Sequence, residues 1–176
     1  MNHTDYSSFL YSACAKAWEK AGARRRAGVT TPLFSVYSGE SVGIGEAPDL
    51  KLLIDWCAKT GLSIIQLLPL NDVGFEFRPY DSQSSLALDP MYLSIGNLLG
   101  CDPASFASGI ASLRARFPAG VSRVDYGIKK AKLEILRRIF DHPSTDLKQR
   151  KFVSFLKSQA GWLADYAIYK ALKEKF

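Results

Sequence analysis

The sequence has little of what metal and disulfide sites require. Its 176 residues include three cysteines, at positions 14, 57 and 101, and two histidines, His3 and His142. An odd number of widely separated cysteines matches neither a metal-ligand spacing nor a disulfide framework. We therefore expect no metal site and no cofactor, and we interpret Cys14, Cys57 and Cys101 as reduced thiols in the core.

Long apolar runs are also absent from the sequence. The longest, GLSIIQLLPL at residues 61–70, is far too short to span a bilayer. The first residues, MNHTDYSSFLYSACAK, do not contain a basic leader followed by an apolar stretch. We expect a cytoplasmic chain that has no membrane partner.

Neither sign of charge dominates, although basic residues are in modest excess. The chain has 23 Lys and Arg against 17 Asp and Glu, which gives a net charge of +6. This excess permits contact with nucleic acid but does not require it. With 47% apolar and 12% aromatic residues, the chain has the length and composition of one globular domain that buries a sizeable core.

Residues 29–95 alternate between strand and helix patterns. The runs PLFSVYS, at 32–38, and LSIIQLLPL, at 62–70, are rich in strand-forming residues and bounded by turn residues. Between them, Asp49 is predicted to cap a helix that ends at a left-handed Gly61. Its apolar face is formed by Leu50, Leu53, Ile54 and Cys57. A strand, a helix and a strand with short joints predict two parallel strands and a right-handed crossover.

Beyond residue 100 the pattern is helical. The segment 124–142 carries one apolar stripe, made of Ile128, Ala131, Ile135 and Ile139. We expect its basic residues on the remaining, solvated surface: Lys129, Lys130, Lys132, Arg137 and Arg138. Two further amphipathic helices follow at 145–159 and 161–176, and the second has an aromatic stripe that we interpret as core, Trp162, Tyr166 and Tyr169. Because Phe176 ends the chain within this pattern, we expect the chain to be truncated there.

Two local patterns resemble known binding motifs only in part. GIGEAP, at 43–48, lacks the third glycine and the acidic partner of a dinucleotide-binding loop. The basic run Arg24–Arg26 has no interleaved aromatic residues, so a solvated turn is the favoured interpretation over a nucleic-acid contact.

The stretch LPLNDVGFEFRPYDSQSSLALDP, at 68–90, begins as a strand and continues as a polar loop. Loops at the carboxyl ends of parallel strands form the ligand sites of α/β proteins. Tyr80 offers an aromatic face for a sugar ring, and hydrogen-bonding groups surround it in sequence: Asn71, Asp72, Asp81, Ser82, Gln83, Ser84 and Ser85. The alternative is an ordinary polar connection capped by its own side chains. The residues themselves leave both interpretations open.

Five blocks, in order, resemble the N-terminal third of the 4-alpha-glucanotransferases, the amylomaltases of glycoside hydrolase family 77. The resemblance runs from about Arg26 to the end of the chain and is carried by RAGVTTPLFSVYS, GIGEAPDLKLLIDWCAKTGLSIIQLLPLND, RPYDSQSSLALDPMYLSI, VDYGIKKAKLEIL and WLADYAIYKALKEKF. It implies an α/β fold, the N-terminal part of a (β/α)8 TIM barrel whose first two strands are residues 33–37 and 62–68.

The resemblance also implies a division of the chain. Residues 1–28 are expected to form a helical lead-in, and residues 29–96 the first βαβ unit with a substrate loop at 69–90. Residues 97–176 are expected to form a mainly helical inserted subdomain. Members of the family transfer α-1,4-glucan units between maltooligosaccharides, so the implied partner is an α-1,4-glucan and not a nucleic acid.

The expected substrate-binding residues are Tyr80, Asn71 and Ser82, of which the resemblance itself implies Tyr80. Tyr80 matches the family's tyrosine beside the sugar at the cleavage point. Arg78 stands where the family commonly has serine, and Asp89 stands where it often has asparagine. We interpret the change at Asp89 as structural.

No catalytic residue is expected in this chain. A retaining glycosidase mechanism uses two carboxylates about 5 to 5.5 Å apart, and in this family they come from later barrel strands. Asp72 and Asp81 share one loop and match no catalytic position, so we expect the chain alone to be inactive. Two alternatives stay open: a non-catalytic sugar-binding module, and a basic RNA-binding domain that uses Arg24–Arg26 and the helix from Asp125. The open sheet edges are expected to promote self-association.

Overall fold

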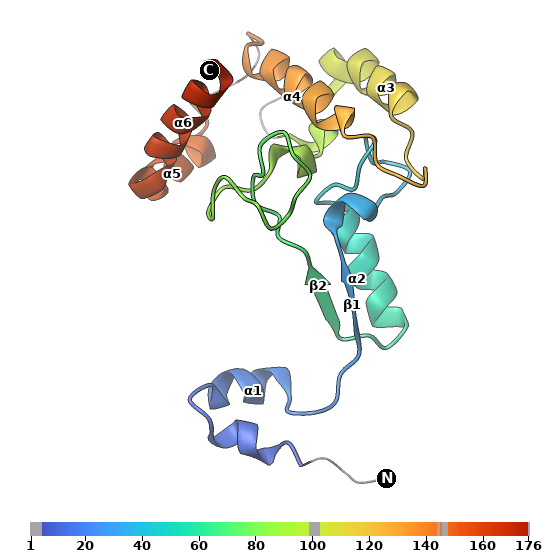
Figure 1. The fold of residues 1–176 in the computed structure, drawn as a ribbon, viewed down its shortest axis with the longest axis vertical. Coiled ribbons are helices and arrows are strands. Elements are labelled where there is room, and N and C mark those ends of the chain that lie inside the picture. The colour runs from blue at the N-terminus through green and yellow to red at the C-terminus, as the bar shows by residue number, and fades with distance from the viewer. Residues whose placement is uncertain (1–4, 99–102, 144, 146–147, 176) are drawn as a thin grey trace.

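A computed structural model describes residues 5–98, 103–143, 145 and 148–175. At its centre lie two parallel strands, β1 (Gly28–Thr31) and β2 (Ile64–Leu67), with Gly28 opposite Ile64. Helix α2 (Asp49–Lys59) connects them in sequence and lies beside them (Figure 1). The predicted parallel strand-helix-strand unit is confirmed.

The predicted first strand at residues 33–37 is wrong. Pairing ends at Thr31, and Leu33–Ser35 forms a turn of 3-10 helix, η2. Pro32 has no N–H to donate to a ladder, and the Ser35 hydroxyl donates to the Pro32 carbonyl at 2.9 Å, which favours the turn. Leu33 is thereby directed into the core, where it is buried.

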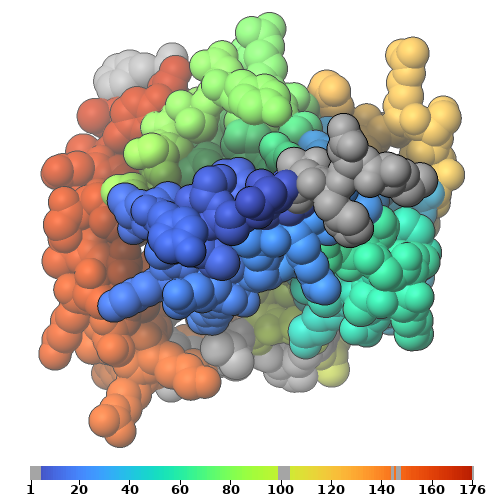
Figure 2. All heavy atoms as spheres, turned by 90° about the horizontal axis from the view of Figure 1, so that it is seen from below, coloured from blue at the N-terminus to red at the C-terminus, as the bar shows by residue number. Residues whose placement is uncertain are grey.

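Apart from α2, the helices lie at the two ends of the strands. At the amino ends of the strands, η1 (Ser7–Tyr11) and α1 (Ala15–Ala21) stand apart from the body (Figure 1), and Figure 2 views the molecule from this side. At the carboxyl ends lie the larger helices: α3 (Ala107–Arg116), α4 (Gly127–Phe140), α5 (Arg150–Ser158) and α6 (Ala160–Lys175). Short 3-10 turns precede α3 at Pro90–Tyr92 (η3), Ile95–Asn97 (η4) and Pro103–Phe106 (η5). None of the helices in the described part of the chain is long and apolar enough to cross a membrane.

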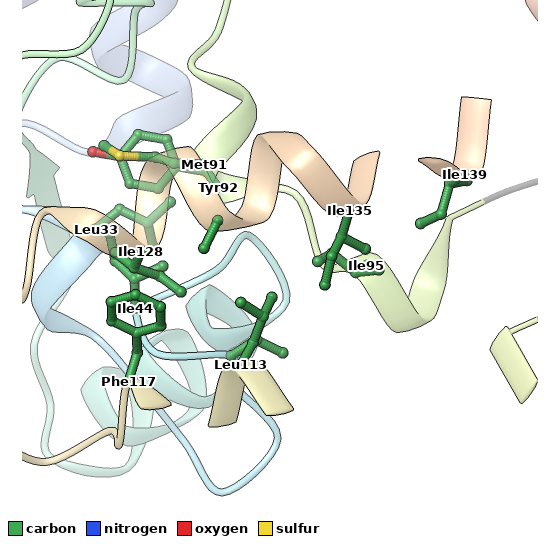
Figure 3. Close-up of a cluster of buried hydrophobic side chains, with 12 residues drawn as sticks. Leu33, Ile44, Met91, Tyr92, Ile95, Leu113, Phe117, Ile128, Ile135 and Ile139 are labelled. Atoms are coloured by element: carbon green, nitrogen blue, oxygen red, sulfur yellow. The ribbon is translucent and has the colours of Figure 1, made fainter. Parts of the chain in front are cut away.

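The core lies between α3, α4 and the segments that follow the two strands (Figure 3). The predicted stripe of α4 is confirmed, because all four of its residues are buried: Ile128, Ala131, Ile135 and Ile139. Leu33, Ile44, Met91 and Ile95 pack against this stripe from the loops. Packing on α4 therefore holds together the chain segments that leave β1 and β2.

Several expectations about burial are corrected by the structure. Lys129 and Lys132 lie buried within α4 instead of on its solvated surface. The aromatic stripe of α6 is not core, since no described residue of α6 is fully buried. Cys57 is a buried thiol as expected, Cys14 is an exposed thiol, and Cys101 lies outside the described residues.

Of the two predicted ends of α2, the C-terminal one is confirmed and the N-terminal one is wrong. Gly61 takes the predicted left-handed conformation, with φ of 76°. Asp49 does not cap the helix through its side chain, because it is the first helical residue. Its carboxylate instead accepts hydrogen bonds from the Ser38 hydroxyl at 2.6 Å, the Ser41 hydroxyl at 2.7 Å and the Glu46 amide at 2.7 Å. Asp49 thus fixes the glycine-containing loop before α2.

Candidate functional site

The 69–90 loop starts at the carboxyl end of β2 and closes on itself. The Asp72 amide donates to the Ala87 carbonyl at 2.9 Å, and the Asp89 amide donates to the Leu70 carbonyl at 2.9 Å. An isolated antiparallel bridge pairs Asn71 with Leu88 between these bonds. We call residues 71–73 and 87–89 the neck of the loop and residues 75–86 its tip.

Two buried carboxylates lie on opposite sides of the neck and share one lysine. Asp72 and Asp89 are 1% and 2% exposed. Lys129 of α4 donates to Asp89 Oδ2, and its Nζ lies 3.7 Å from Asp72 Oδ1. Asp89 also accepts from the Met91 amide at 3.0 Å, which caps η3, and from the Val73 amide at 3.4 Å. These contacts support the expected structural role of Asp89.

Helix α6 supplies two further partners of Asp72. Lys170 Nζ lies 2.8 Å from Asp72 Oδ2, and the Tyr166 hydroxyl donates to the same oxygen. The Gly74 amide donates to Asp72 Oδ1 at 2.8 Å. Burial opposes ionisation of Asp72, but the hydrogen bonds from Lys170, Tyr166 and Gly74 outweigh it and hold the pKa of this carboxyl below its ordinary value. Burial, together with the neighbouring carboxylate, raises the pKa of Tyr166.

An aromatic contact anchors the tip of the loop on its other side. The Phe77 ring stacks on Tyr126 with centroids 4.2 Å apart and planes 5° apart, and it meets Phe34 edge-on at 6.2 Å. A hollow of about 600 Å³ adjoins this contact and is lined in part by Phe34, Tyr37, Arg123 and Tyr126. The hollow is bordered by the segment after β1 and by the chain that leads into α4, and the stacked Phe77 ring joins the loop after β2 to one of its lining residues, Tyr126.

The predicted substrate residues occupy two levels of the loop. Tyr80 is 79% exposed on the tip, within a turn in which the Asp81 amide donates to the Arg78 carbonyl at 2.9 Å. Ser82 is also exposed on the tip, whereas Asn71 is half-buried in the neck. Arg78 pairs with Glu76 at 3.0 Å on the exposed surface. The structure presents the Tyr80 ring to solvent above an anchored base.

Sequence reasoning missed the three side chains that hold Asp72. Lys129 was expected in solvent, Tyr166 was expected in an aromatic core stripe, and Lys170 was not singled out. A signal for the first was present, because Lys129 and Lys132 lie beside Ile128 and Ala131 in a helix whose opposite surface offers other basic positions. Lysine is almost never fully buried unless it is paired, so a buried position for either lysine would call for an acidic partner.

A second buried ion pair fixes the GIGEAP segment. Lys132 Nζ donates to Glu46 Oε1 at 2.6 Å and to the Leu93 carbonyl at 2.8 Å. Burial lowers the pKa of Lys132 even though Glu46 favours its charged form. A Cβ on Gly45 would lie 2.0 Å from the Leu33 carbonyl oxygen, so this glycine serves close backbone packing. The segment is structural, which agrees with the rejection of a dinucleotide loop.

Comparison with known proteins assigns the family. The model of glycoside hydrolase family 77, described as 4-alpha-glucanotransferase, matches residues 31–176. The chain belongs to glycoside hydrolase family 77. The resemblance seen in the sequence is therefore confirmed.

Curated 4-alpha-glucanotransferases match nearly the whole of this chain. A 4-alpha-glucanotransferase of Chlamydia pneumoniae is 37% identical over 98% of the chain and 33% of its own length. That of Chlamydia caviae is 35% identical over 92% of the chain and 31% of its own length. The chain thus spans about a third of the length of these relatives.

A solved amylomaltase structure shares the fold. The amylomaltase from Corynebacterium glutamicum superposes with a TM-score of 0.70 over 88% of this chain and 24% of that chain. At 24% sequence identity, this likeness shows the arrangement of the elements alone.

Proposed function

We propose that this chain is the N-terminal part of a 4-alpha-glucanotransferase that transfers α-1,4-glucan units between maltooligosaccharides by a retaining double displacement. Its strands are the first two of a (β/α)8 barrel, residues 1–28 are a helical lead-in, and residues 97–176 are a helical inserted subdomain. The family match supports the activity. The observation that carries the assignment of a sugar site to this chain is the exposed Tyr80 on a loop whose base is anchored by ion pairs.

In this proposal the chain contacts the donor sugar and leaves the bond chemistry to other residues. The Tyr80 ring packs against the apolar face of a glucosyl unit, while Ser82 and Asn71 bond its hydroxyls. Asp72 and Asp89 do not suit the roles of nucleophile and acid, because each is buried and bonded to lysine. The catalytic carboxylates lie outside this chain, and the enzyme works in the cytoplasm.

The RNA-binding alternative is less well supported by the structure. A basic helix that binds phosphates must present its cations to solvent. In α4, Lys129 and Lys132 are instead neutralised by buried carboxylates. Arg26, in the other basic run, donates to the Gly22 carbonyl at 3.2 Å.

A sugar titration of the chain tests the proposal. Addition of maltoheptaose should shift amide NMR signals in the 69–90 loop of the wild-type chain. Tyr80→Ala should weaken this response about two- to tenfold, because an aromatic contact contributes about 0.5 to 1.5 kcal/mol. Tyr80→Phe should be milder, because it keeps the ring. The melting temperature should stay the same in both variants, since an exposed side chain contributes little to stability.

Tyr11→Ala is the matched control, because Tyr11 is 88% exposed on η1 at the other end of the strands. It should bind maltoheptaose as the wild type does. A lower melting temperature for Tyr80→Ala with unchanged sugar binding would remove Tyr80 from the site. Salt-sensitive RNA binding without any sugar response would replace the transferase proposal by the RNA-binding alternative.

A further inference from the structure

The neck of the 69–90 loop is closed by charge as well as by backbone pairing. Asp72 stands on one side of it and Asp89 on the other, 17 positions apart in the chain, and both are buried. Two buried carboxylates brought together without a cation repel one another and lose their hydration. The neck therefore requires a buried cation between them.

Lys129 is the cation that contacts both sides of the neck. Its Nζ bonds Asp89 and lies 3.7 Å from Asp72, and its side chain is 3% exposed. Lys170 reaches Asp72 and, at 3.3 Å, Gln83 in the tip. Within the described part of the chain, Lys129 alone has ion pairs with both carboxylates. Two carboxylates and two ammonium groups balance in charge.

Buried ion pairs contribute little net stability, since the cost of desolvation offsets the Coulomb attraction. What they determine is geometry, because one arrangement satisfies every charge and the alternatives leave a buried charge unpaired. In this chain the arrangement fixes how the loop that carries Tyr80 leaves the strand. The backbone bonds of the neck then hold the same register that the ion pairs require.

We propose that Lys129 is a positioning residue for sugar binding: by bridging Asp72 and Asp89 it holds the neck closed and keeps Tyr80 on the tip in place to meet a glucosyl unit. The role in sugar binding rests on the proposed function. Helix α4 thereby sets the geometry of a site that it does not itself line at Tyr80. The substrate class is that of the proposed function, an α-1,4-glucan.

The test compares two matched double variants of the chain. Lys129→Met with Asp89→Asn removes the bridge without leaving a lone buried charge on Asp89. Lys132→Met with Glu46→Gln removes the other buried ion pair of the same helix, whose Nζ and Oε1 lie 2.6 Å apart outside the loop. Each variant loses one buried ion pair, so we expect a similar loss of global stability in both. The two variants differ in where the lost pair lies, at the neck or outside the loop.

Amide hydrogen exchange of Gly74 and Gln83 measures closure of the neck without any sugar. These amides donate to the Asp72 carboxylate and to the Asp72 carbonyl, so neither double variant removes their acceptors. In the Lys129 double variant, exchange should become roughly 10- to 100-fold faster. The neck can then open without breaking the ion pair between Lys129 and Asp89, so local opening costs less free energy. In the Lys132 double variant, exchange should follow the change in global stability alone. Maltoheptaose affinity should fall in the first variant and stay near the wild-type value in the second.

Equal exchange in the two double variants, or unchanged sugar affinity with an open neck, would overturn the proposal. If the first double variant does not fold, Asp89→Asn alone decides the matter. It keeps Lys129 beside Asp72 and an amide oxygen to cap η3, and it should still speed exchange at Gly74 and Gln83, whose acceptors on Asp72 it leaves in place; wild-type protection there would refute the bridge. A wild-type chain that does not bind maltoheptaose would refute the proposed function, while the exchange data would still test the closure of the neck.

Discussion

Gly45 shows how a single position ties the core to the segment after β1. An added Cβ would lie 2.0 Å from the Leu33 carbonyl oxygen and 2.3 Å from that of Val36. Backbone atoms cannot move aside as a flexible side chain can. The contact joins the loop before α2 to the 3-10 turn η2, which stands where a strand was predicted.

We predict that Gly45→Ala destabilises the chain by about 1 to 3 kcal/mol, the usual cost of overpacking. Chemical denaturation followed by circular dichroism measures this change. Gly39→Ala is the control, because a Cβ there meets no atom within 4 Å. It should change stability by less than about 0.5 kcal/mol. Equal effects of the two substitutions would show that the close approach does not exist in solution.

Asp72 gives the stability of the chain a dependence on acid pH. Its folded-state pKa lies below the ordinary 3.8, so ionised Asp72 stabilises the fold at pH values above 3.8. This contribution is lost as the pH falls through the folded-state pKa. Asp72→Asn should lower stability at pH 7 by about 1 to 3 kcal/mol, because the charge-assisted hydrogen bond from Lys170, whose side chain is 29% exposed, is lost.

The same substitution should flatten the acid limb of a plot of melting temperature against pH between pH 7 and pH 2. Asp81→Asn, on the exposed tip of the same loop, should leave the wild-type curve in place. An acid limb of unchanged steepness in Asp72→Asn would mean that other carboxylates account for the acid sensitivity.

At the scale of elements, α4 both packs the core and neutralises buried carboxylates, and it does so with neighbouring residues on one surface. Its apolar stripe packs the core, and the lysines beside the stripe neutralise buried carboxylates of two different loops. Ile128 is fully buried, whereas Lys130, two residues later, is exposed. Substitutions on the buried and on the exposed side of α4 can therefore be compared separately.

We predict that Ile128→Ala lowers the free energy of unfolding by about 2 to 5 kcal/mol through loss of burial and a residual cavity. Lys130→Ala should have an effect below about 0.5 kcal/mol. Urea denaturation of both variants measures the difference. If the two variants unfold at the same urea concentration, α4 does not form the core as described.

Local periodicity predicted the elements whose residues interact within a few turns. The helix from Asp49, the stripe of α4 and the strand around Ile65 follow from spacing alone. The error at 33–37 came from weighing strand propensity above the missing donor of Pro32. The partners of Asp72 were out of reach of any local pattern, since Tyr166 lies 94 positions away. The loop could be predicted as a candidate site because Tyr80 and its polar neighbours are contiguous in sequence.

At the scale of the whole molecule, much apolar surface stays uncovered. Large apolar side chains of α2 are about half exposed, namely Leu52, Ile54 and Trp56, and Ile64 of β2 is 46% exposed. Within the described residues, β1 and β2 form a sheet of two strands. Parallel strands ordinarily need cover on both faces, and open edges pair with other chains.

We predict that the purified chain self-associates through this surface. Light scattering should show a mass that rises with concentration above that of a monomer of 19.5 kDa. Trp56→Lys should shift the association to higher concentration, because it places a charge in the apolar surface. Tyr11→Lys adds the same charge on η1 and should have less effect. A monomer at high concentration with fully protected amides in β2 would refute this prediction.

The contact between Tyr166 and Asp72 also has a consequence for synthesis on the ribosome. The two residues are separated by 94 positions. At translation rates of roughly 5 to 20 residues per second, Tyr166 is synthesised about 5 to 20 s after Asp72. During that interval Lys129 of α4 is made before α6, so the bridge across the neck becomes available before the two α6 partners of Asp72 exist. The contacts from Tyr166 and Lys170 are therefore the last ones that the neck can acquire during synthesis.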